Sequence, residues 1–159
     1  MSQFQDVALQ NFNIEIKADG RWYHEGGEIK RLGLVKLFAS VLSCDEAGRY
    51  WLTTPVERGE IRVEDAPFVI IAMRVAGAGA TQNIYLRDNL DEEYLLSAGL
   101  PLALRVGDNG HIKPYIMLEK GLSALIKHAV FYEMAEIALA CDDQMLVSDG
   151  MAFSLEGQG

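Results

Sequence analysis

Apolar residues recur along the chain with two different periods, and each period predicts one type of element. Over residues 31–43 they fall at intervals of three and four, which predicts an amphipathic helix with one buried stripe. The same spacing over residues 122–139 predicts a second helix, with Gly121 at its entrance. Elsewhere apolar and polar residues alternate, so we expect two long helices among many strands.

The alternating segments predict a series of strands joined by turns. Residues 68–75 are apolar at nearly every position, as expected for a strand that is covered on both faces at the centre of a sheet. We expect residues 82–87 and 102–106 to follow this strand in a meander. The other predicted strands are 13–17, 21–24, 28–29, 49–54 and 56–63.

The order of these elements indicates an internal repeat of about 100 residues. Each half holds an Asp-Gly or Asn-Gly turn, an amphipathic helix, and a cysteine followed by two acids, in Cys44-Asp45-Glu46 and Cys141-Asp142-Asp143. Chance similarity of short acidic loops is the alternative explanation. We interpret the chain as an α+β protein with a duplicated core, with mostly antiparallel strands and one long helix per half. The repeats would span residues 12–66 and 67–156, packed tightly together because no Pro/Ser-rich linker separates them.

Composition and charge narrow the class of partner. Half of the residues are hydrophobic and 23% are charged, as in soluble globular proteins. The formal net charge of -9 disfavours nucleic acid and anionic membranes, because both are bound mainly through cationic side chains. Residues 1–80 are nearly balanced, with 9 cationic and 11 acidic residues, so contacts to an anionic ligand are expected from this half.

Targeting segments and membrane spans are not expected. The first residues lack the basic region and the apolar run of a signal peptide, and no uninterrupted apolar stretch of about 20 residues occurs. Two cysteines, Cys44 and Cys141, cannot form the disulfide framework of a small secreted domain. We expect them to end the buried helix stripes as small hydrophobic residues, with redox sensing as the alternative. The sequence therefore predicts a cytoplasmic protein with reduced thiols.

Motifs for phosphate, metal and acid-base chemistry are weak. The run Gly77-Ala78-Gly79-Ala80 joins two predicted strands, so we interpret it as a hairpin loop and not as a phosphate-binding loop. Three histidines without a local pair of ligands predict no zinc site, and we expect no other metal and no cofactor. Glu64 and Asp65 are typical of a turn, with acid-base chemistry or cation binding as the alternative.

Aromatic and cationic residues gather in one segment of the first half. Trp22, Tyr23 and His24 are consecutive, and Arg31 follows shortly after them. A flat aromatic surface beside an arginine is suited to hold a base and a phosphate together. Packing of the aromatic rings in the core, with His24 as a structural hydrogen-bonding residue, is the alternative.

Several short motifs occur in a defined order over residues 12–156. They are Trp22-Tyr23-His24-Glu25-Gly26, Ile29 with Arg31, Tyr50, Thr54-Pro55-Val56-Glu57, Val63-Glu64-Asp65-Ala66-Pro67-Phe68-Val69, Pro101, Leu104-Arg105-Val106, Pro114-Tyr115 and Tyr132-Glu133. In this order they resemble the bacterial family called domain of unknown function 1285. The resemblance implies a duplicated α+β core, a C-terminal half loosely similar to pleckstrin-homology domains, and a nucleotide-like ligand site between the halves. It also implies a role in signal transduction, without an established activity.

We therefore expect a cytoplasmic ligand-binding or sensory protein, not an enzyme, that holds a small nucleotide-like anion at the interface of its two halves. We expect Trp22, Tyr23 and Tyr115 to supply a stacking or apolar surface. Arg31 and Arg105 would bind the phosphate. His24 and Asp65 would contact the polar edges of the ligand. Two alternatives stay open, namely a protein-interaction adaptor module and a metal-assisted hydrolase or transferase that uses Glu64 and Asp65. A protein partner or a homodimer is compatible with each of these three hypotheses.

Overall fold

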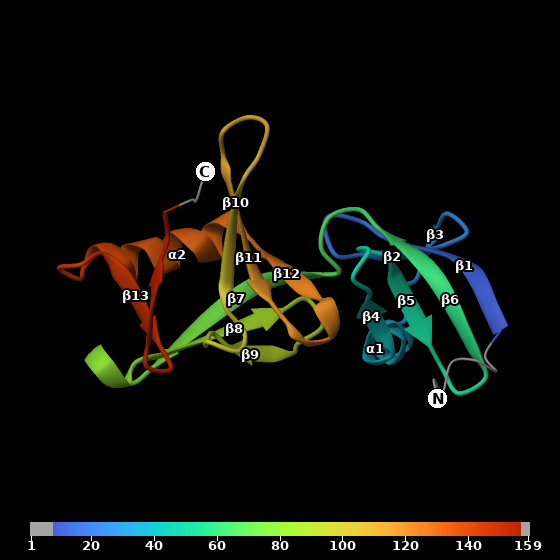
Figure 1. The fold of residues 1–159 in the computed structure, drawn as a ribbon, viewed down its shortest axis with the longest axis horizontal. Coiled ribbons are helices and arrows are strands. Elements are labelled where there is room, and N and C mark those ends of the chain that lie inside the picture. The colour runs from blue at the N-terminus through green and yellow to red at the C-terminus, as the bar shows by residue number, and fades with distance from the viewer. Residues whose placement is uncertain (1–7, 157–159) are drawn as a thin grey trace. The chain divides into compact units, whose positions relative to one another are not determined.

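The structure is a computed structural model that describes residues 8–156. The chain forms two compact units (Figure 1). The first unit comprises Met1–Pro67 and Lys120–Leu122, and the second comprises Phe68–Glu119 and Ser123–Gly159. Each unit is built on one six-stranded mixed sheet.

The sheet of the first unit consists of two antiparallel three-stranded groups, with one helix in the connection between them. Its elements are β1 (Ala8–Ile16), β2 (Trp22–His24), β3 (Gly27–Glu28), α1 (Leu32–Ser40), β4 (Leu42–Cys44), β5 (Tyr50–Thr53) and β6 (Glu57–Val63). The strand order is β3-β2-β1-β6-β5-β4. Strands β1 and β6 join the two groups at the centre and run parallel to each other.

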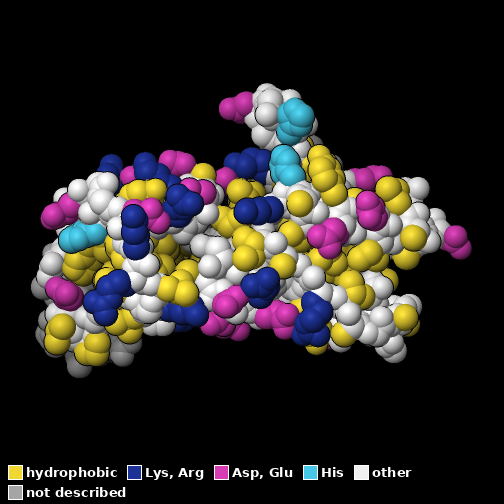
Figure 2. Space-filling model, turned by 180° about the vertical axis from the view of Figure 1, so that it is seen from behind, with side chains coloured by type: hydrophobic (Ala, Val, Ile, Leu, Met, Phe, Trp, Pro, Cys, Tyr) yellow, Lys and Arg dark blue, Asp and Glu magenta, His cyan; other side chains and the backbone are white. Residues whose placement is uncertain are grey.

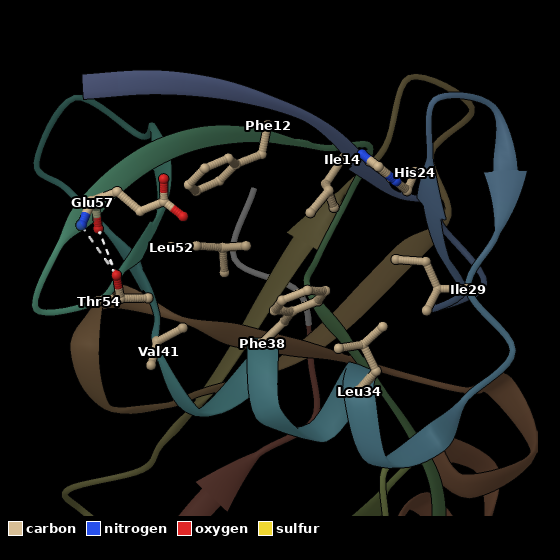
Figure 3. Close-up of a pocket in the computed structure, with 10 residues that line it drawn as sticks. All are labelled: Phe12, Ile14, His24, Ile29, Leu34, Phe38, Val41, Leu52, Thr54 and Glu57. Carbon is tan, nitrogen blue, oxygen red and sulfur yellow. Dashed lines mark hydrogen bonds between the residues drawn. The ribbon is translucent and has the colours of Figure 1, made fainter. Parts of the chain in front are cut away.

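Strand β1 carries a bulge near its middle. Its pairing with β6 shifts by two positions between Asn11 and Glu15. Within this bulge Asn13 takes a left-handed φ of 55°, and its backbone N–H donates to the Asn11 side chain over 2.9 Å. Asparagine tolerates this conformation better than most residues do. Phe12 and Ile14, two positions apart on β1, both face the space between the sheet and the helix (Figure 3).

The second unit repeats this sheet and adds a helix and a hairpin after it. Its elements are β7 (Phe68–Ala76), η1 (Gly79–Thr81), β8 (Asn83–Asp88), β9 (Glu93–Leu95), β10 (Leu102–Val106), β11 (Ile112–Met117), η2 (Glu119–Gly121, shared with the first unit), β12 (Ser123–Ile126), α2 (His128–Leu139), β13 (Met145–Ser148) and β14 (Met151–Ser154). The strand order is β10-β11-β12-β7-β8-β9, and its first and sixth strands, β7 and β12, again pair in parallel. The two sheets therefore share one topology, which confirms the predicted α+β class with duplicated halves.

Helix α2 and strand β13 close the core of the second unit. The helix packs against β7 and β13 and buries Val130, Met134 and Ala138. The fully buried Ser148 hydroxyl donates to the Leu96 carbonyl over 2.6 Å and accepts the Ile84 N–H over 2.9 Å. These two bonds fix β13 to the sheet.

The offset in sequence between the two copies of the repeat differs from the predicted one. The first strands of the two sheets begin at Ala8 and Phe68, only 60 residues apart. Helix α1 lies between the third and fourth strands of its sheet, whereas α2 follows the sixth strand of the other. The predicted offset of about 100 residues came from matching these two helices, which are not equivalent.

Both predicted helices are longer than the observed ones. Helix α1 ends at Ser40, because Leu42 pairs with Leu52 and starts β4. Helix α2 begins at His128, because the preceding Ser123–Ile126 forms β12 beside β7. Alternate burial along β12 shows that these apolar residues fit a strand as well as a helix stripe, and pairing with a neighbouring strand decides between the two. Among the described residues, neither helix is long and apolar enough to cross a membrane.

Two further predictions were wrong. Leu102–Val106 does not follow β8 across the sheet, since β9 takes that place and β10 pairs with β11. Cys44 ends a strand and is half-buried, while Cys141 follows α2 and is exposed. Neither cysteine therefore ends a buried helix stripe.

Candidate functional site

A mostly apolar cavity of about 410 Å³ lies in the first unit between the sheet and α1 (Figure 3). Seven of its ten lining residues are hydrophobic. The ten are Phe12, Ile14, His24, Ile29, Leu34, Phe38, Val41, Leu52, Thr54 and Glu57. On the part of the surface that this unit forms, hydrophobic side chains are also visible among charged ones (Figure 2).

Gly59 gives the cavity part of its depth. It lies on β6 at the position that pairs with Leu52 of β5. The ring of Phe12 lies directly over it, so closely that a Cβ at this position would collide with three ring carbons. Glycine within a strand often marks such a close approach. The absence of a side chain at Gly59 therefore lets the Phe12 ring lie against the sheet and leaves space beneath α1.

A carboxylate occupies one end of the cavity. The hydroxyl of Thr54 accepts the backbone N–H of Glu57 over 3.1 Å and donates to its carbonyl over 3.2 Å. Gln10 Nε2 donates to Glu57 Oε2 over 2.6 Å. The carboxylate points toward Phe12 and the interior of the cavity (Figure 3). This end of an otherwise apolar space is therefore a hydrogen-bond acceptor.

An imidazole lies at the opposite end of the lining, on β2 (Figure 3). The side chain of His24 is 54% exposed, and its Nε2 lies 4.0 Å from Glu25 Oε1. His24 therefore marks a solvent-accessible side of the cavity.

The structure separates the aromatic residues that the sequence places together. Trp22 is only 1% exposed, and its ring stacks on Phe38 with 6.3 Å between centroids. Its indole Nε1 is buried without a hydrogen-bond partner among the described residues. Tyr23 lines a different, polar hollow, together with Lys17 and Arg62 among others. Trp22 thus supports the wall of the apolar cavity, whereas Tyr23 does not take part in it.

The remaining predicted site residues lie elsewhere in their units. Arg31 is the exposed residue just before α1, and Asp65 is half-buried after β6. In the second unit the guanidinium of Arg105 lies 5.1 Å from the ring centroid of Tyr115, which is 4% exposed. Of the seven predicted residues, all of them within the described range, only His24 lines the apolar cavity.

Phe12 and Glu57, which line the cavity, and Gly59, which lies under the Phe12 ring, were not predicted as site residues. A signal for Phe12 was present, because it continues the alternation of Ile14 and Ile16 by two positions. A glycine inside a predicted strand also indicates close contact with another side chain. The direction of the Glu57 carboxylate depends on the hydrogen bonds with Thr54 and on the strands that pair with β6, and no sequence pattern predicts it.

Asp45 holds the turn between β4 and β5 and has a structural role. Its carboxylate accepts Trp51 Nε1 over 3.0 Å and the backbone N–H groups of Arg49 and Ala47 over 2.8 and 3.0 Å. The Trp51 hydrogen bond, followed by those from the backbone, lowers the pKa of Asp45 below its ordinary value. Asp45 therefore caps the turn that joins these two strands.

Glu64 also has structural contacts. Its Oε1 accepts the backbone N–H of Ala18 over 3.1 Å, and its Oε2 lies 3.9 Å from Lys17 Nζ. Within residues 8–156, no three His, Cys, Asp or Glu side chains are grouped so that they could hold a metal ion. The described geometry thus points to the apolar cavity as the candidate site.

Comparisons with known proteins give one consistent family. The model of the N-terminal domain of the domain of unknown function DUF1285 matches residues 2–66, and that of the C-terminal domain matches residues 67–155. A solved DUF1285 family protein from Silicibacter pomeroyi DSS-3 is 32% identical, with a TM-score of 0.84 over 95% of this chain and 84% of that one. Another from Shewanella baltica OS155 is 27% identical, with a TM-score of 0.60 over 78% of this chain and 91% of that one. No curated protein matches the chain significantly.

Proposed function

The chain belongs to the DUF1285 family, and we propose that its first unit is a binding module for a small, mainly apolar molecule held between the sheet and α1. The cavity is the observation that carries this proposal. The proposal keeps the expected ligand-binding or sensory role, and with it the role in signal transduction that the family resemblance implies. It replaces the expected nucleotide-like anion by an apolar ligand.

The size and lining of the cavity support binding. Its volume of about 410 Å³ lies within the usual range for small-molecule sites, about 300–1,000 Å³. The cavity is open to solvent on the side of His24, so water would fill it in the absence of a ligand. An apolar molecule that displaces this water gains about 25 cal/mol for each Å² of apolar surface removed from water. The mainly apolar lining therefore suits an apolar molecule.

The charges of the lining favour an apolar ligand over a nucleotide. Phosphate groups are usually held by arginine, lysine or backbone N–H groups at a helix N-terminus. The ten lining residues include no lysine and no arginine, and they do include the Glu57 carboxylate. A phosphate in this cavity would meet repulsion without compensation.

Uptake of the neutral fluorophore N-phenyl-1-naphthylamine tests the proposal, because its emission rises in apolar surroundings. We expect saturable binding to the full chain with one site. Leu34→Phe should fill the cavity and weaken binding at least tenfold. Leu37→Phe is the matched control, since Leu37 lies on the same helix but is 60% exposed and outside the lining.

The outcomes separate the explanations. Saturable binding that is lost in Leu34→Phe and kept in Leu37→Phe supports a site in the cavity. Absence of saturable binding, or equal affinities of both variants and the parent protein, would overturn the proposal. A thermal shift with millimolar nucleotides that exceeds the shift with apolar probes would favour the nucleotide-like ligand instead.

A further inference from the structure

We infer that the ligand carries a hydrogen-bond donor on its apolar body, in the simplest case a protonated amine, and that Glu57 is the residue that recognises it. The inference rests on the proposed function and names the chemical class of its ligand. It follows from the orientation, the partners and the surroundings of this one carboxylate.

The backbone of Glu57 is fixed at the entrance of β6. The reciprocal pair of hydrogen bonds with the Thr54 hydroxyl, 3.1 and 3.2 Å long, holds both the N–H and the carbonyl of Glu57. The backbone N–H of Thr54 donates to the same carbonyl over 2.8 Å. A side chain on so constrained a backbone starts in a defined direction, which here leads toward the cavity (Figure 3).

The carboxylate has capacity for a further donor. Gln10 Nε2 donates to Oε2 over 2.6 Å. Glu57 is half-buried, and an ionised carboxylate accepts several hydrogen bonds, so a ligand donor can replace the water that would otherwise hydrate it. A ligand with an ammonium or hydroxyl group would supply that donor.

The charged side chains of the lining favour a cationic head group on the ligand over an anionic one. Glu57 is the one acidic side chain among the ten lining residues, and none of them is a lysine or an arginine. His24, the other titratable group of the lining, lies at the opposite end and is more than half exposed. An anionic head group directed toward Glu57 would be repelled, whereas a cation gains a charge-assisted hydrogen bond.

Three competitors with one apolar body test the inference. They are 1-naphthylmethylamine, 1-naphthalenemethanol and 1-naphthoate, which are cationic, neutral and anionic at pH 7. Each is titrated against bound N-phenyl-1-naphthylamine in the full chain. We expect the amine to bind about tenfold more tightly than the alcohol, as for a hydrogen bond to a charged group, and the naphthoate to bind most weakly.

Glu57→Gln should abolish the preference for the amine and leave the affinity for N-phenyl-1-naphthylamine within about twofold. Glu28→Gln is the matched control, because Glu28 is exposed on β3 and gives the same change in net charge. The order of the three competitors in the parent protein needs no variant and therefore does not depend on folding of Glu57→Gln.

The inference and the proposed function fail differently. If the fluorophore binds but naphthoate competes as well as the amine, the inference is wrong and the apolar site stands. The inference is likewise wrong if Glu57→Gln keeps the preference for the amine. If the fluorophore does not bind saturably, the proposed function fails and the inference fails with it.

Discussion

Gly59→Ala tests the central geometric feature of the cavity, the contact between the Phe12 ring and the backbone of β6. The added methyl group would collide with three carbons of that ring. The backbone itself accepts alanine, because Gly59 is not among the positive-φ residues. The ring must therefore move away from the sheet, and the cavity is the free space that receives it.

The expected change in the free energy of unfolding combines two opposite effects. Overpacking of a fitted contact costs about 1–3 kcal/mol. Replacing glycine by alanine at a compatible backbone position stabilises by about 0.4–1 kcal/mol. The net expectation for Gly59→Ala is a loss of about 1–2 kcal/mol. Gly33→Ala is the matched control, because Gly33 lies on α1 with no atom within 4 Å of the added Cβ, and it should gain about 0.5 kcal/mol.

Tryptophan fluorescence during urea unfolding measures this difference. Trp22 and Trp51 are the two tryptophans of the chain, and both lie in the first unit. With a slope of about 1 kcal/mol per molar urea, the midpoint should fall by about 1–2 M in Gly59→Ala and rise by about 0.5 M in Gly33→Ala. Binding of N-phenyl-1-naphthylamine should weaken in Gly59→Ala only. A Gly59→Ala protein as stable as the parent, with unchanged binding, would show that the ring does not lie on Gly59.

Two further predictions concern the structural carboxylates. Asp88 is fully buried and accepts the Leu90 and Glu92 N–H groups and the Tyr94 hydroxyl over 2.8, 3.0 and 2.8 Å. Asp88→Ala should lower the free energy of unfolding by about 2–6 kcal/mol, and Asp88→Asn should lower it clearly less. Urea unfolding followed by circular dichroism measures both values. Equal losses in the two variants would contradict this account. Because the folded-state pKa of Asp45 is lowered, its contribution is present above its unfolded value of about 3.9 and is lost as the pH falls through the folded-state pKa. Tryptophan-monitored urea midpoints between pH 6 and 2.5 should therefore fall less steeply in Asp45→Asn than in the parent protein, and parallel curves would refute this role.

The parts of the fold that depend on local pattern were predictable. Alternation identified β2, β5 and β6. The all-apolar run at residues 68–75 correctly indicated a central strand, but the expectation that it is covered on both faces was wrong, because Ile71 and Val75 are exposed. Duplication was predicted correctly, but from two helices that are not equivalent, so the offset between the copies was wrong. The turn at Asp45 follows from the tendency of aspartate to accept nearby backbone N–H groups.

The parts that depend on pairing between distant strands were not predictable. Leu42 and Ser123–Ile126 carry apolar spacings that satisfy a helix and a strand alike, and their partners Leu52 and β7 decide the outcome. The cavity depends on the contact of Phe12 with Gly59, 47 residues away along the chain. The sequence alone therefore lists the residues of the site but does not show which of them come into contact in the folded chain.

The two copies of the sheet differ in how they are covered, and this difference explains why the cavity lies in the first unit. Met134 of α2 is fully buried, whereas Phe38 of α1 is half-buried and already borders free space. Met134→Ala should therefore cost about 2–5 kcal/mol, because it creates a new void. Phe38→Ala removes a larger side chain but mainly loses its stacking on Trp22, so we expect a cost of only about 1–2 kcal/mol, below the usual ~3–5 kcal/mol for a packed phenylalanine. Tryptophan fluorescence reports the Phe38 variant, and amide hydrogen exchange in β7 reports the Met134 variant. A cost for Phe38→Ala equal to or above that for Met134→Ala would mean that α1 packs as tightly as α2, and the ligand site would then have no room in the first unit.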